Sequence, residues 1–332
     1  MKKVIYDRYG SAAVLEMIDV PMPAPAGTQL LIQVKAVSLN PLDWKIMEGK
    51  MKLMSGSTFP KGIGIDFSGV VEQVGEGVTN YRPGDAVFGA VAPFKGGALA
   101  EYLLIREKDI ALKPATISFE QAAAMPTVGT AALQILEGLV RVGKGTQVLI
   151  NGASGGIGMF AIQIAKMKGA HVTSVASTTG LSWVKRWGSD AVLDYRKEDV
   201  LSSGKRYDVV LDLSGKMPYQ AAKRIMKPES VYVNSIPGPR EIVEAFLHSL
   251  FSKQKYKVLL LKQTQTHLES LSAYAAAGVE ILVGASFPMA SFRQAYAEAS
   301  AGGIVGKAVV TVGITEPART GDAVVPNRVT RQ

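Results

Sequence analysis

The chain has 332 residues, 47% hydrophobic and 20% charged, which is enough apolar material for two packed domains and shows no signature of disorder. It contains no cysteine, which excludes disulfides, thiolate catalysis and zinc sites with cysteine ligands. The net charge of +9 arises from basic residues scattered among acidic ones, which disfavours nucleic-acid binding and leaves a weak attraction for anionic cofactors or membrane surfaces.

The sequence shows no segment for membrane insertion or export. No apolar run reaches the roughly 18 residues that a membrane-spanning helix needs. The first residues, MKKVIYDRYG, run directly into a strand pattern and lack the apolar core of a signal peptide. We therefore expect a cytoplasmic protein without an integral membrane segment.

The first 120 residues have the pattern of β-structure. Short segments alternate apolar and polar residues and are separated by Pro and Gly, as in QLLIQVKAVSLN at 29–40 and FSGVVEQVGEGV at 67–78. Pro83-Gly84-Asp85 marks a turn between two such segments. Many short strands at this spacing predict a small barrel or a sandwich.

Helical periodicity begins near residue 118, where Ser118 is a suitable N-cap for a helix that extends to about residue 140. From residue 146, apolar strands alternate with amphipathic helices, beginning with TQVLING at 146–152 and GIGMFAIQIAKMKG at 156–169. This alternation predicts a doubly wound parallel sheet. A last strand, GKAVVTVG at 306–313, follows this region and is placed to return to the first domain, and the polar residues beyond it predict a loose tail.

A glycine-rich loop, NGASGGIG at 151–158, joins the first of these strands to its helix. Glycines let the backbone approach a pyrophosphate closely, and the helix N-terminus offers free N–H groups and a positive dipole end. With the strand and helix order around it, the loop predicts a dinucleotide site; a tight turn for helix–strand packing is the alternative. The predicted contacts are Gly152, Ser154, Gly155, Gly156, Ile157 and Gly158.

The next strand ends in Ser177-Thr178-Thr179 and carries no acid at the place where NAD sites usually hold the ribose 2′-hydroxyl with Asp or Glu. Hydroxyl groups suit a 2′-phosphate, and Lys185 and Arg186 follow on the next helix to supply charge. We therefore predict NADP(H) as the cofactor, with Ser177, Thr178 and Lys185 among its contacts. A solvated helix face is the alternative for the two basic residues.

Two further patterns are interpreted as structural. Tyr219 and Lys223 form the Y-x-x-x-K of short-chain dehydrogenases, but Tyr219 follows the glycine-rich loop too closely for that family, in which the loop also lies near the N-terminus. The three histidines, His171, His248 and His267, have no metal-ligand spacing, so no metal site is expected.

Six segments, in order along the chain, carry a resemblance to a known family. They are SLNPLDWK at 38–45, GIDFSGVVE at 64–72, RPGDAVFG at 82–89, GGALAEY at 96–102, the glycine-rich loop, and GKAVV at 306–310. With them the chain resembles the zinc-free quinone oxidoreductase branch of the medium-chain dehydrogenase/reductase superfamily. The form of SLNPLDWK is most similar to the chloroplast-envelope homologue type.

The resemblance implies an α/β fold of two domains with the active site in the cleft between them. Residues 1–122 and 287–316 would form a GroES-like β-rich catalytic domain, and residues 123–286 an inserted Rossmann domain that binds NADP(H). Residues 317–332 would be a flexible tail. Family members commonly dimerise through the strand that matches YKVLLL at 256–261, so a homodimer is expected.

The resemblance also implies the reaction. Zinc alcohol dehydrogenases of this superfamily carry Gly-His-Glu where this chain has Gly64-Ile65-Asp66. Without a Lewis acid, hydride transfer to an alkene conjugated with a carbonyl is more feasible than transfer to an isolated ketone. We therefore expect a zinc-independent, NADPH-dependent reductase of quinones or α,β-unsaturated carbonyls. Relatives that reduce enoyl thioesters carry a tyrosine near residues 48–51, which read EGKM here, so that substrate class is disfavoured.

Several site residues are implied by position within the family pattern. Asn40 would lie beside the nicotinamide ribose or the substrate, and Lys45 would be a charged group at the cleft mouth, which makes these two the catalytic candidates. The remaining cofactor contacts would be Thr127 and Thr130 at the nicotinamide, Tyr195 at the adenosine phosphate, and Asn234, Ser235 and Ile236 bordering the nicotinamide. The alternatives are a turn residue at Asn40, helix capping by the threonines, sheet-edge packing by Tyr195 and a solvated helix face at Lys45.

A second function class stays open at this point. The basic charge and the lack of an evident general acid also suit a nucleotide-binding redox sensor or a peripheral membrane protein with little catalysis.

Overall fold

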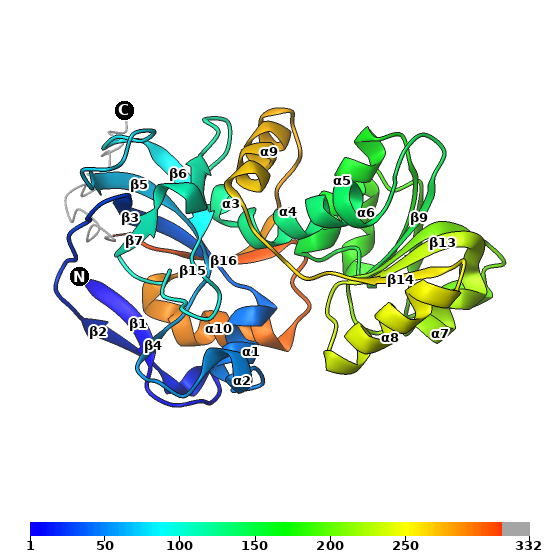
Figure 1. Cartoon of the computed structure of the whole chain (residues 1–332), viewed down its shortest axis with the longest axis horizontal. Helices are drawn as coiled ribbons and strands as arrows, with labels where there is room; N and C mark the ends of the chain where they lie inside the picture. The colour runs from blue at the N-terminus through cyan, green and yellow to red at the C-terminus, as the bar shows by residue number, and fades with distance from the viewer. Residues whose placement is uncertain (314–332) are drawn as a thin grey trace, which may run out of the picture.

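The computed structural model describes residues 1–313, except for the side chains of residues 249–251; the tail predicted at 317–332 lies outside the described residues. Figure 1 shows two lobes side by side, a β-rich lobe that contains the N-terminus and an α/β lobe built around a parallel sheet. Helices α4 and α9 lie between them (Figure 1). The predicted mixed α/β class is confirmed.

The β-lobe contains a seven-stranded sheet and a three-stranded sheet. The large sheet has the order β15-β16-β3-β5-β6-β8, with β7 also paired to β3. Its strands are β3 (Gln29–Ser38), β5 (Asp66–Val74), β6 (Ala86–Ala90), β7 (Tyr102–Arg106), β8 (Ile110–Leu112), β15 (Val283–Pro288) and β16 (Lys307–Thr311). The small sheet has the order β2-β1-β4 and consists of β1 (Lys2–Tyr6), β2 (Leu15–Asp19) and β4 (Lys61–Gly62).

This lobe also contains the helices α1 (Pro41–Met47), α2 (Lys52–Ser55) and α10 (Phe292–Ala301). Helix α1 begins directly after β3, because Asn40 is extended with φ −127° and Pro41 supplies a preset helical φ at the first position. The Asp43 Oδ2 atom accepts the Asn40 N–H at 2.8 Å, which satisfies a donor at the start of the helix.

The α/β lobe has a six-stranded parallel sheet in the order β11-β10-β9-β12-β13-β14. Its strands are β9 (Gln147–Asn151), β10 (His171–Ala176), β11 (Ala191–Asp194), β12 (Tyr207–Asp212), β13 (Met226–Asn234) and β14 (Lys255–Val258). Its helices are α5 (Gly156–Met167), α6 (Leu181–Arg186), α7 (Tyr219–Ala222) and α8 (Pro239–Phe251). Helices α5 and α6 cover one face of the sheet, and α7 and α8 cover the other (Figure 1). The chain changes direction between β9 and β12, which makes the carboxyl ends of these two strands the switch point where such sheets bind ligands.

The connection between the lobes departs from the predicted continuous helix at 118–140. It is divided into α3 (Phe119–Ala123), α4 (Pro126–Leu133) and a π-helical segment (Gln134–Leu139). Pro126 explains the first break, because proline lacks the N–H that a continuing helix would donate and its ring clashes with the preceding turn. The predicted N-cap at Ser118 is present, with its side chain accepting the Gln121 N–H.

The chain returns to the β-lobe after α9 (Gln265–Ala276). β15 pairs with β16, and β16 pairs with β3, so both late strands complete the large sheet. The predicted start of this return, residue 287, falls inside β15, which already begins at Val283.

Among the described residues, no helix combines the length and the apolar character that crossing a membrane requires.

Candidate active site

The glycine-rich loop lies at the carboxyl end of β9, at the switch point of the sheet. Gly152 adopts φ +80°, a conformation that side chains with a Cβ atom rarely take. A Cβ atom at Gly158 would approach the Ala153 carbonyl oxygen to 2.1 Å, so only glycine lets helix α5 pack this closely on the loop. The two glycines therefore fix the path of the loop.

The loop forms a cradle that fits an anionic group. Helix α5 begins after Gly155, and no side chain caps its N-terminus, which leaves the N–H groups of the first turn without intrahelical acceptors. Around a Cβ atom built at Gly155, the nearest atom is the Gly152 oxygen at 3.7 Å, so the space above this glycine is open. Open space beside free N–H groups at a helix dipole is what a pyrophosphate requires.

Polar side chains organise the loops next to the cradle. The Asn151 Nδ2 atom donates to Asp212 Oδ1 at 3.0 Å and to Ser214 Oγ at 2.9 Å, which ties the ends of β9 and β12 together. The buried Asp212 carboxylate also accepts backbone N–H groups from Gly215 and Met217. Asp212 was not singled out from the sequence; its partners come from the loop that directly follows it and from Asn151 at the end of β9.

The predicted residues Asn234, Ser235 and Ile236 follow β13 at the same edge of the sheet. Asn234 is buried, and its Oδ1 atom accepts the Ile236 N–H at 2.8 Å. The Ser235 hydroxyl donates to the Asp212 carbonyl at 3.1 Å. Asn234 and Ser235 therefore shape the loop, and Ile236, which is exposed, presents an apolar side chain beyond it.

At the end of β10, the hydroxyls of the predicted ribose contacts already have partners. The Ser177 and Thr179 hydroxyls are 3.0 Å apart, and Thr178 Oγ1 donates to Asp194 Oδ2 at 2.5 Å. Hydrogen bonds from Thr178 and from the Arg196 N–H hold the pKa of Asp194 below its usual value. The residues directly after β10 are not acidic, but Asp194 at the end of the neighbouring strand β11 lies beside Thr178.

Tyr195 and Lys185, two further predicted cofactor contacts, lie beyond β10 along the chain. Tyr195 directly follows β11, and more than half of its surface is exposed. Lys185 is exposed on the last turn of α6, whereas the adjacent Arg186 is paired with Glu280 at 2.9 Å. Of these two basic residues, only Lys185 has no ion pair within residues 1–313.

The residues predicted at the nicotinamide end meet around one buried carboxylate, Asp66. The Asn40 Nδ2 atom donates to Asp66 Oδ2 at 3.0 Å. Thr127 donates its hydroxyl to Asp66 Oδ1 at 2.7 Å and its backbone N–H to Oδ2 at 3.2 Å. Burial raises the pKa of Asp66, while the charge of Lys307 and the Thr127 and Asn40 hydrogen bonds lower it. Asp66 therefore joins residues of β5, α1 and α4 into one network.

Asn40 and Thr130 are deeply buried, unlike Thr127. Only 1% of the Asn40 surface is exposed, and its carboxamide is engaged inside the protein. The Thr130 hydroxyl is buried and has no hydrogen-bond partner within the described part of the chain. Thr127 is partly exposed at the N-terminal end of α4.

Sequence reasoning missed the lysine that completes this network. Lys307, the first residue of β16, is buried and donates to Asn40 Oδ1 and to the Leu39 carbonyl, each at 2.6 Å. Burial lowers the pKa of Lys307, and the charges of Asp66 and Asp43 raise it. The available signal was a lysine inside the otherwise apolar strand GKAVVTVG.

Asp43 and Lys45 occupy helix α1 beyond Asn40. Burial raises the pKa of Asp43 to about 8, and the nearby charge of Asp66 contributes to this shift, whereas the Asn40 N–H hydrogen bond and the charge of Lys307 oppose it. Its Oδ1 atom has no partner within residues 1–313, and Asp43 lines a cavity of about 10 Å³, room for a single water molecule. Lys45 is half-buried; burial and then the charge of Lys50 lower its pKa.

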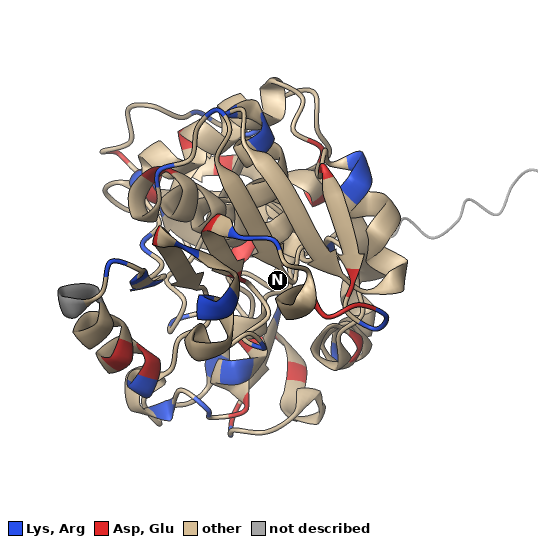
Figure 2. Ribbon diagram, turned by 90° about the vertical axis from the view of Figure 1, so that its right-hand side faces the viewer, with Lys and Arg blue, Asp and Glu red and all other residues tan. Residues whose placement is uncertain are grey.

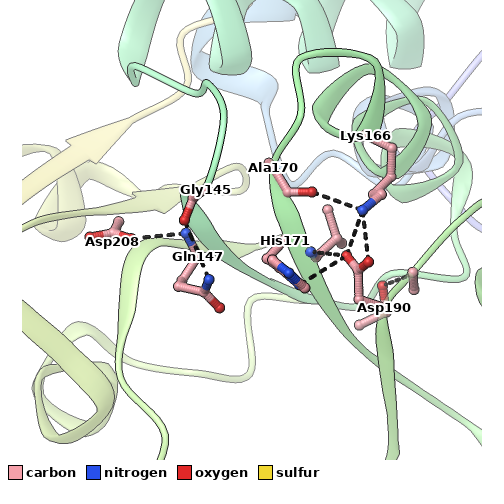
Figure 3. Close-up of polar contacts among 10 residues, drawn as sticks. Gly145, Gln147, Lys166, Ala170, His171, Asp190 and Asp208 are labelled. Carbon is pink, nitrogen blue, oxygen red and sulfur yellow. Dashed lines mark hydrogen bonds and ion pairs between the residues drawn. The ribbon is translucent and has the colours of Figure 1, made fainter.

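Two other polar regions do not belong to this site. Figure 3 shows Lys166 and His171 around Asp190, with Lys166 Nζ at 2.7 Å from Asp190 Oδ2. This cluster lies at the amino ends of the strands, opposite the glycine-rich loop, and its role is structural. Tyr219, which the sequence analysis interprets as structural, is buried and stacks on Tyr256.

A larger cavity of about 420 Å³ also lies apart from the network. None of its lining residues belongs to the glycine-rich loop or contacts Asp66. Its polar groups bond to one another, as in Gln265 Nε2 to the Tyr81 hydroxyl at 3.2 Å and Ser272 Oγ to the Leu112 carbonyl at 2.8 Å. These bonds connect α9 with the β-lobe, so the glycine-rich loop and the Asp66 network remain the candidate site.

Charged side chains are distributed over the surface without a single concentrated patch on the face that Figure 2 draws, where Lys and Arg are spread among Asp and Glu. Within residues 1–313, no three His, Asp or Glu side chains converge in an arrangement that would hold a metal ion.

Comparison with known proteins supports the resemblance. A family model described as "Alcohol dehydrogenase GroES-like domain" matches residues 26–115, and one described as "Zinc-binding dehydrogenase" matches residues 187–310. The chain is 32% identical to the chloroplast envelope quinone oxidoreductase homolog of Arabidopsis thaliana, over 93% of this chain and 98% of that protein.

Two further matches add structural and functional detail. The structure of the quinone oxidoreductase from Coxiella burnetii superposes with a TM-score of 0.87 at 31% identity, covering 94% of this chain and 99% of that chain. The NADPH-dependent alkenal/one oxidoreductase of Arabidopsis thaliana is 39% identical over 65% of this chain and 58% of its own length. The chain is thus an oxidoreductase, and it belongs to the quinone oxidoreductases of the medium-chain dehydrogenase/reductase superfamily, as its motifs predict.

Proposed function

We propose that this protein is a zinc-independent reductase that transfers hydride from NADPH to quinones or to the alkene of α,β-unsaturated carbonyls. The observation that carries the proposal is the open, uncapped cradle at Gly155, which β16 connects to the Asp66 network. An open helix N-terminus in one lobe and a buried polar network in the other, joined through β16, suit a dinucleotide that extends from one to the other. The names of relatives that act on quinones and alkenals, one of them with NADPH, support the same reaction class.

The chain offers contacts for each part of NADP(H). The first turn of α5 would hold the pyrophosphate, Ser177 and Lys185 the 2′-phosphate, and Tyr195 the adenosine. Thr127 and the loop that ends in Ile236 would border the nicotinamide. When bound, NADPH supplies the hydride, while the protein orients it and excludes competing reactions.

The acceptor class follows from the residues around Asp66. Gly64-Ile65-Asp66 replaces the metal-binding Gly-His-Glu of zinc enzymes, and Ile65 is buried. An isolated ketone requires strong polarisation, whereas a conjugated acceptor develops its charge on an enolate or quinol oxygen that hydrogen-bond donors stabilise. Lys45 is our candidate donor, because its half-buried ammonium has no ion pair within residues 1–313.

A substrate panel tests this function. The purified protein, with its zinc content determined by elemental analysis, is assayed for NADPH oxidation with quinones, enones, enals and saturated ketones, with and without a chelator. We expect turnover with the conjugated acceptors only, unaffected by the chelator. Absence of turnover across the panel would favour the alternative of a redox sensor or peripheral membrane protein with little catalysis.

Lys185 is expected to contribute to the preference for NADPH over NADH. Lys185→Ala should lower kcat/KM for NADPH about tenfold and leave kcat/KM for NADH unchanged, because only NADPH carries the 2′-phosphate. Arg186→Ala is the matched control, since Arg186 is already paired with Glu280. Equal effects of Lys185→Ala on both cofactors would show that Lys185 is only a solvated side chain.

Lys45 should give the reaction an alkaline limit. An ammonium is charged only below its pKa, and burial lowers the pKa of Lys45, so kcat should fall as pH rises through a value below that of an ordinary lysine. Lys45→Met should lower kcat about 100-fold and abolish the decrease of kcat at alkaline pH. Lys50→Met removes a neighbouring positive charge and should move the fall to higher pH. A pH profile of kcat that is the same in all three proteins would exclude Lys45 from the reaction.

We also propose a homodimer. β14 is the terminal strand of its sheet, and Leu260 and Leu261 directly beyond it are exposed. Light scattering of the purified protein would test this, and a monomeric mass would contradict it.

A further inference from the structure

Lys307 is a buried lysine that connects the glycine-rich loop with Asn40. The preceding residue, Gly306, donates its N–H to the Ser154 carbonyl at 2.9 Å and is paired with Gly155 in a parallel bridge. A Cβ atom at Gly156 would lie 2.7 Å from Lys307 Cδ, so the aliphatic part of the lysine packs directly on the loop. Its position thus depends on the loop that forms the phosphate cradle.

The ammonium of Lys307 points away from the loop and into the Asp66 network. It donates to two uncharged oxygens, the Leu39 carbonyl and Asn40 Oδ1, each at 2.6 Å. Its charge is felt by Asp66 and Asp43, but neither carboxylate lies within ion-pair distance of Nζ in the described structure. The Asn40 carboxamide therefore stands between the cation and the Asp66 carboxylate.

This arrangement allows only one orientation of the Asn40 carboxamide. Its Oδ1 atom faces the ammonium of Lys307, and its Nδ2 atom faces Asp66 Oδ2 at 3.0 Å. A flipped amide would place its oxygen against the carboxylate and its NH₂ group against the ammonium, and both contacts would be repulsive. In a low-dielectric interior these interactions are strong, so the two charges lock the side chain.

Asp66 extends the effect of Lys307 to helix α4, which lies between the two lobes. The carboxylate that accepts from Asn40 also accepts two hydrogen bonds from Thr127, at the start of α4. The chain of contacts therefore runs from the glycine-rich loop through Lys307, Asn40 and Asp66 to Thr127. It links the part of the protein that would hold the pyrophosphate to the part that would border the nicotinamide.

We propose that Lys307 is a positioning residue for hydride transfer, which holds Asn40 and, through Asp66, Thr127 in the geometry that the bound nicotinamide requires. The inference rests on the reductase function proposed above. A positioning role predicts loss of turnover without loss of cofactor affinity, because the loop N–H groups that would bind phosphate remain in place. Misplacement of reacting groups by about 1 Å is enough to slow a reaction 100-fold.

Lys307→Met tests the proposal, because methionine keeps an unbranched stem against Gly156 and removes only the ammonium. We expect kcat to fall 10- to 100-fold, while the dissociation constant of NADPH, measured by fluorescence titration, changes less than about threefold. Asn40→Ala should lower kcat by a similar factor, and the double variant should be no slower than the slower single variant, since both act through one contact. A crystal structure of Lys307→Met should show the Asn40 carboxamide displaced from Asp66.

Lys61→Met is the matched control. Lys61 is also buried and donates to a backbone carbonyl, that of Ser55 at 2.6 Å, but it has no contact with Asn40 or Asp66. The proposal is overturned if Lys307→Met lowers kcat no more than Lys61→Met, or if the effects of Lys307→Met and Asn40→Ala multiply. Should Lys307→Met not fold, Lys307→Gln takes its place in the same cycle. A wild-type protein that does not bind NADPH would instead contradict the proposed function, which separates the two failures.

Discussion

Gly155→Val should abolish cofactor binding while leaving the fold intact. Gly155 has an extended backbone, φ −84° and ψ 178°, which valine adopts readily, and a Cβ atom there meets no protein atom closer than 3.7 Å. The added side chain would therefore fill only the cradle in which the pyrophosphate would lie. We expect the dissociation constant of NADPH to rise about 100-fold or more, measured by fluorescence titration.

The control for this experiment is a second glycine with open surroundings. Gly143 also has no atom within 4 Å of a Cβ position, and it lies before β9, at the opposite end of that strand from the cradle. Gly143→Val should leave NADPH affinity unchanged, and both variants should melt close to the wild type. A Gly155→Val protein that binds NADPH normally would show that the glycine-rich loop serves only helix packing.

Asp66→Asn should greatly lower the stability of the protein, although it replaces only one side-chain oxygen by nitrogen. The carboxylate accepts hydrogen bonds from Asn40, Thr127 and Ser38. In asparagine, one carboxylate oxygen is replaced by an NH₂ group, which cannot accept a hydrogen bond and would face the N–H and O–H groups of these residues. The substitution would also leave the buried Lys307 ammonium with one less counter-charge. We expect the free energy of unfolding to fall by about 3 kcal/mol, measured by urea denaturation followed by tryptophan fluorescence.

Asp109→Asn provides the comparison. Asp109 pairs with Arg106 at 2.9 Å, but both side chains are partly exposed, so its loss should cost less than about 1 kcal/mol. If Asp66→Asn were as stable as Asp109→Asn, Asp66 would not be the centre of a charged network. The reductase activity of Asp66→Asn should also be lost, because Thr127 and Asn40 would no longer be held.

The sequence predicted those features that depend on neighbours along the chain. The loop at 151–158 sits between a strand and a helix whose patterns are local, so its place at the carboxyl end of β9 was expected. The alternation of strands and helices predicted the parallel sheet in the same way. Pro126 shows the limit of periodicity, because one imino acid divides a helical pattern that is otherwise continuous.

The return of the last strand to the first domain was predicted, but the individual side-chain contacts that it creates were not. Lys307 lies 267 positions after Asn40, and only the return of β16 to β3 brings the two together. Likewise, Asp194 lies at the end of β11, which pairs with β10. Its carboxylate therefore contacts Thr178 after β10, although the residues directly after β10 are not acidic. Individual roles in cofactor binding, the homodimer and a cytoplasmic location stay predictions.

The most direct test of the proposed chemistry is the fate of the transferred hydride. NADPH doubly deuterated at C4 of the nicotinamide is incubated with the protein and an α,β-unsaturated ketone, and the product is analysed by mass spectrometry and NMR. We predict one deuterium on the carbon β to the carbonyl and an intact ketone, because charge would develop on an enolate oxygen. Deuterium on a carbinol carbon would contradict this account, since it would mean direct reduction of the carbonyl.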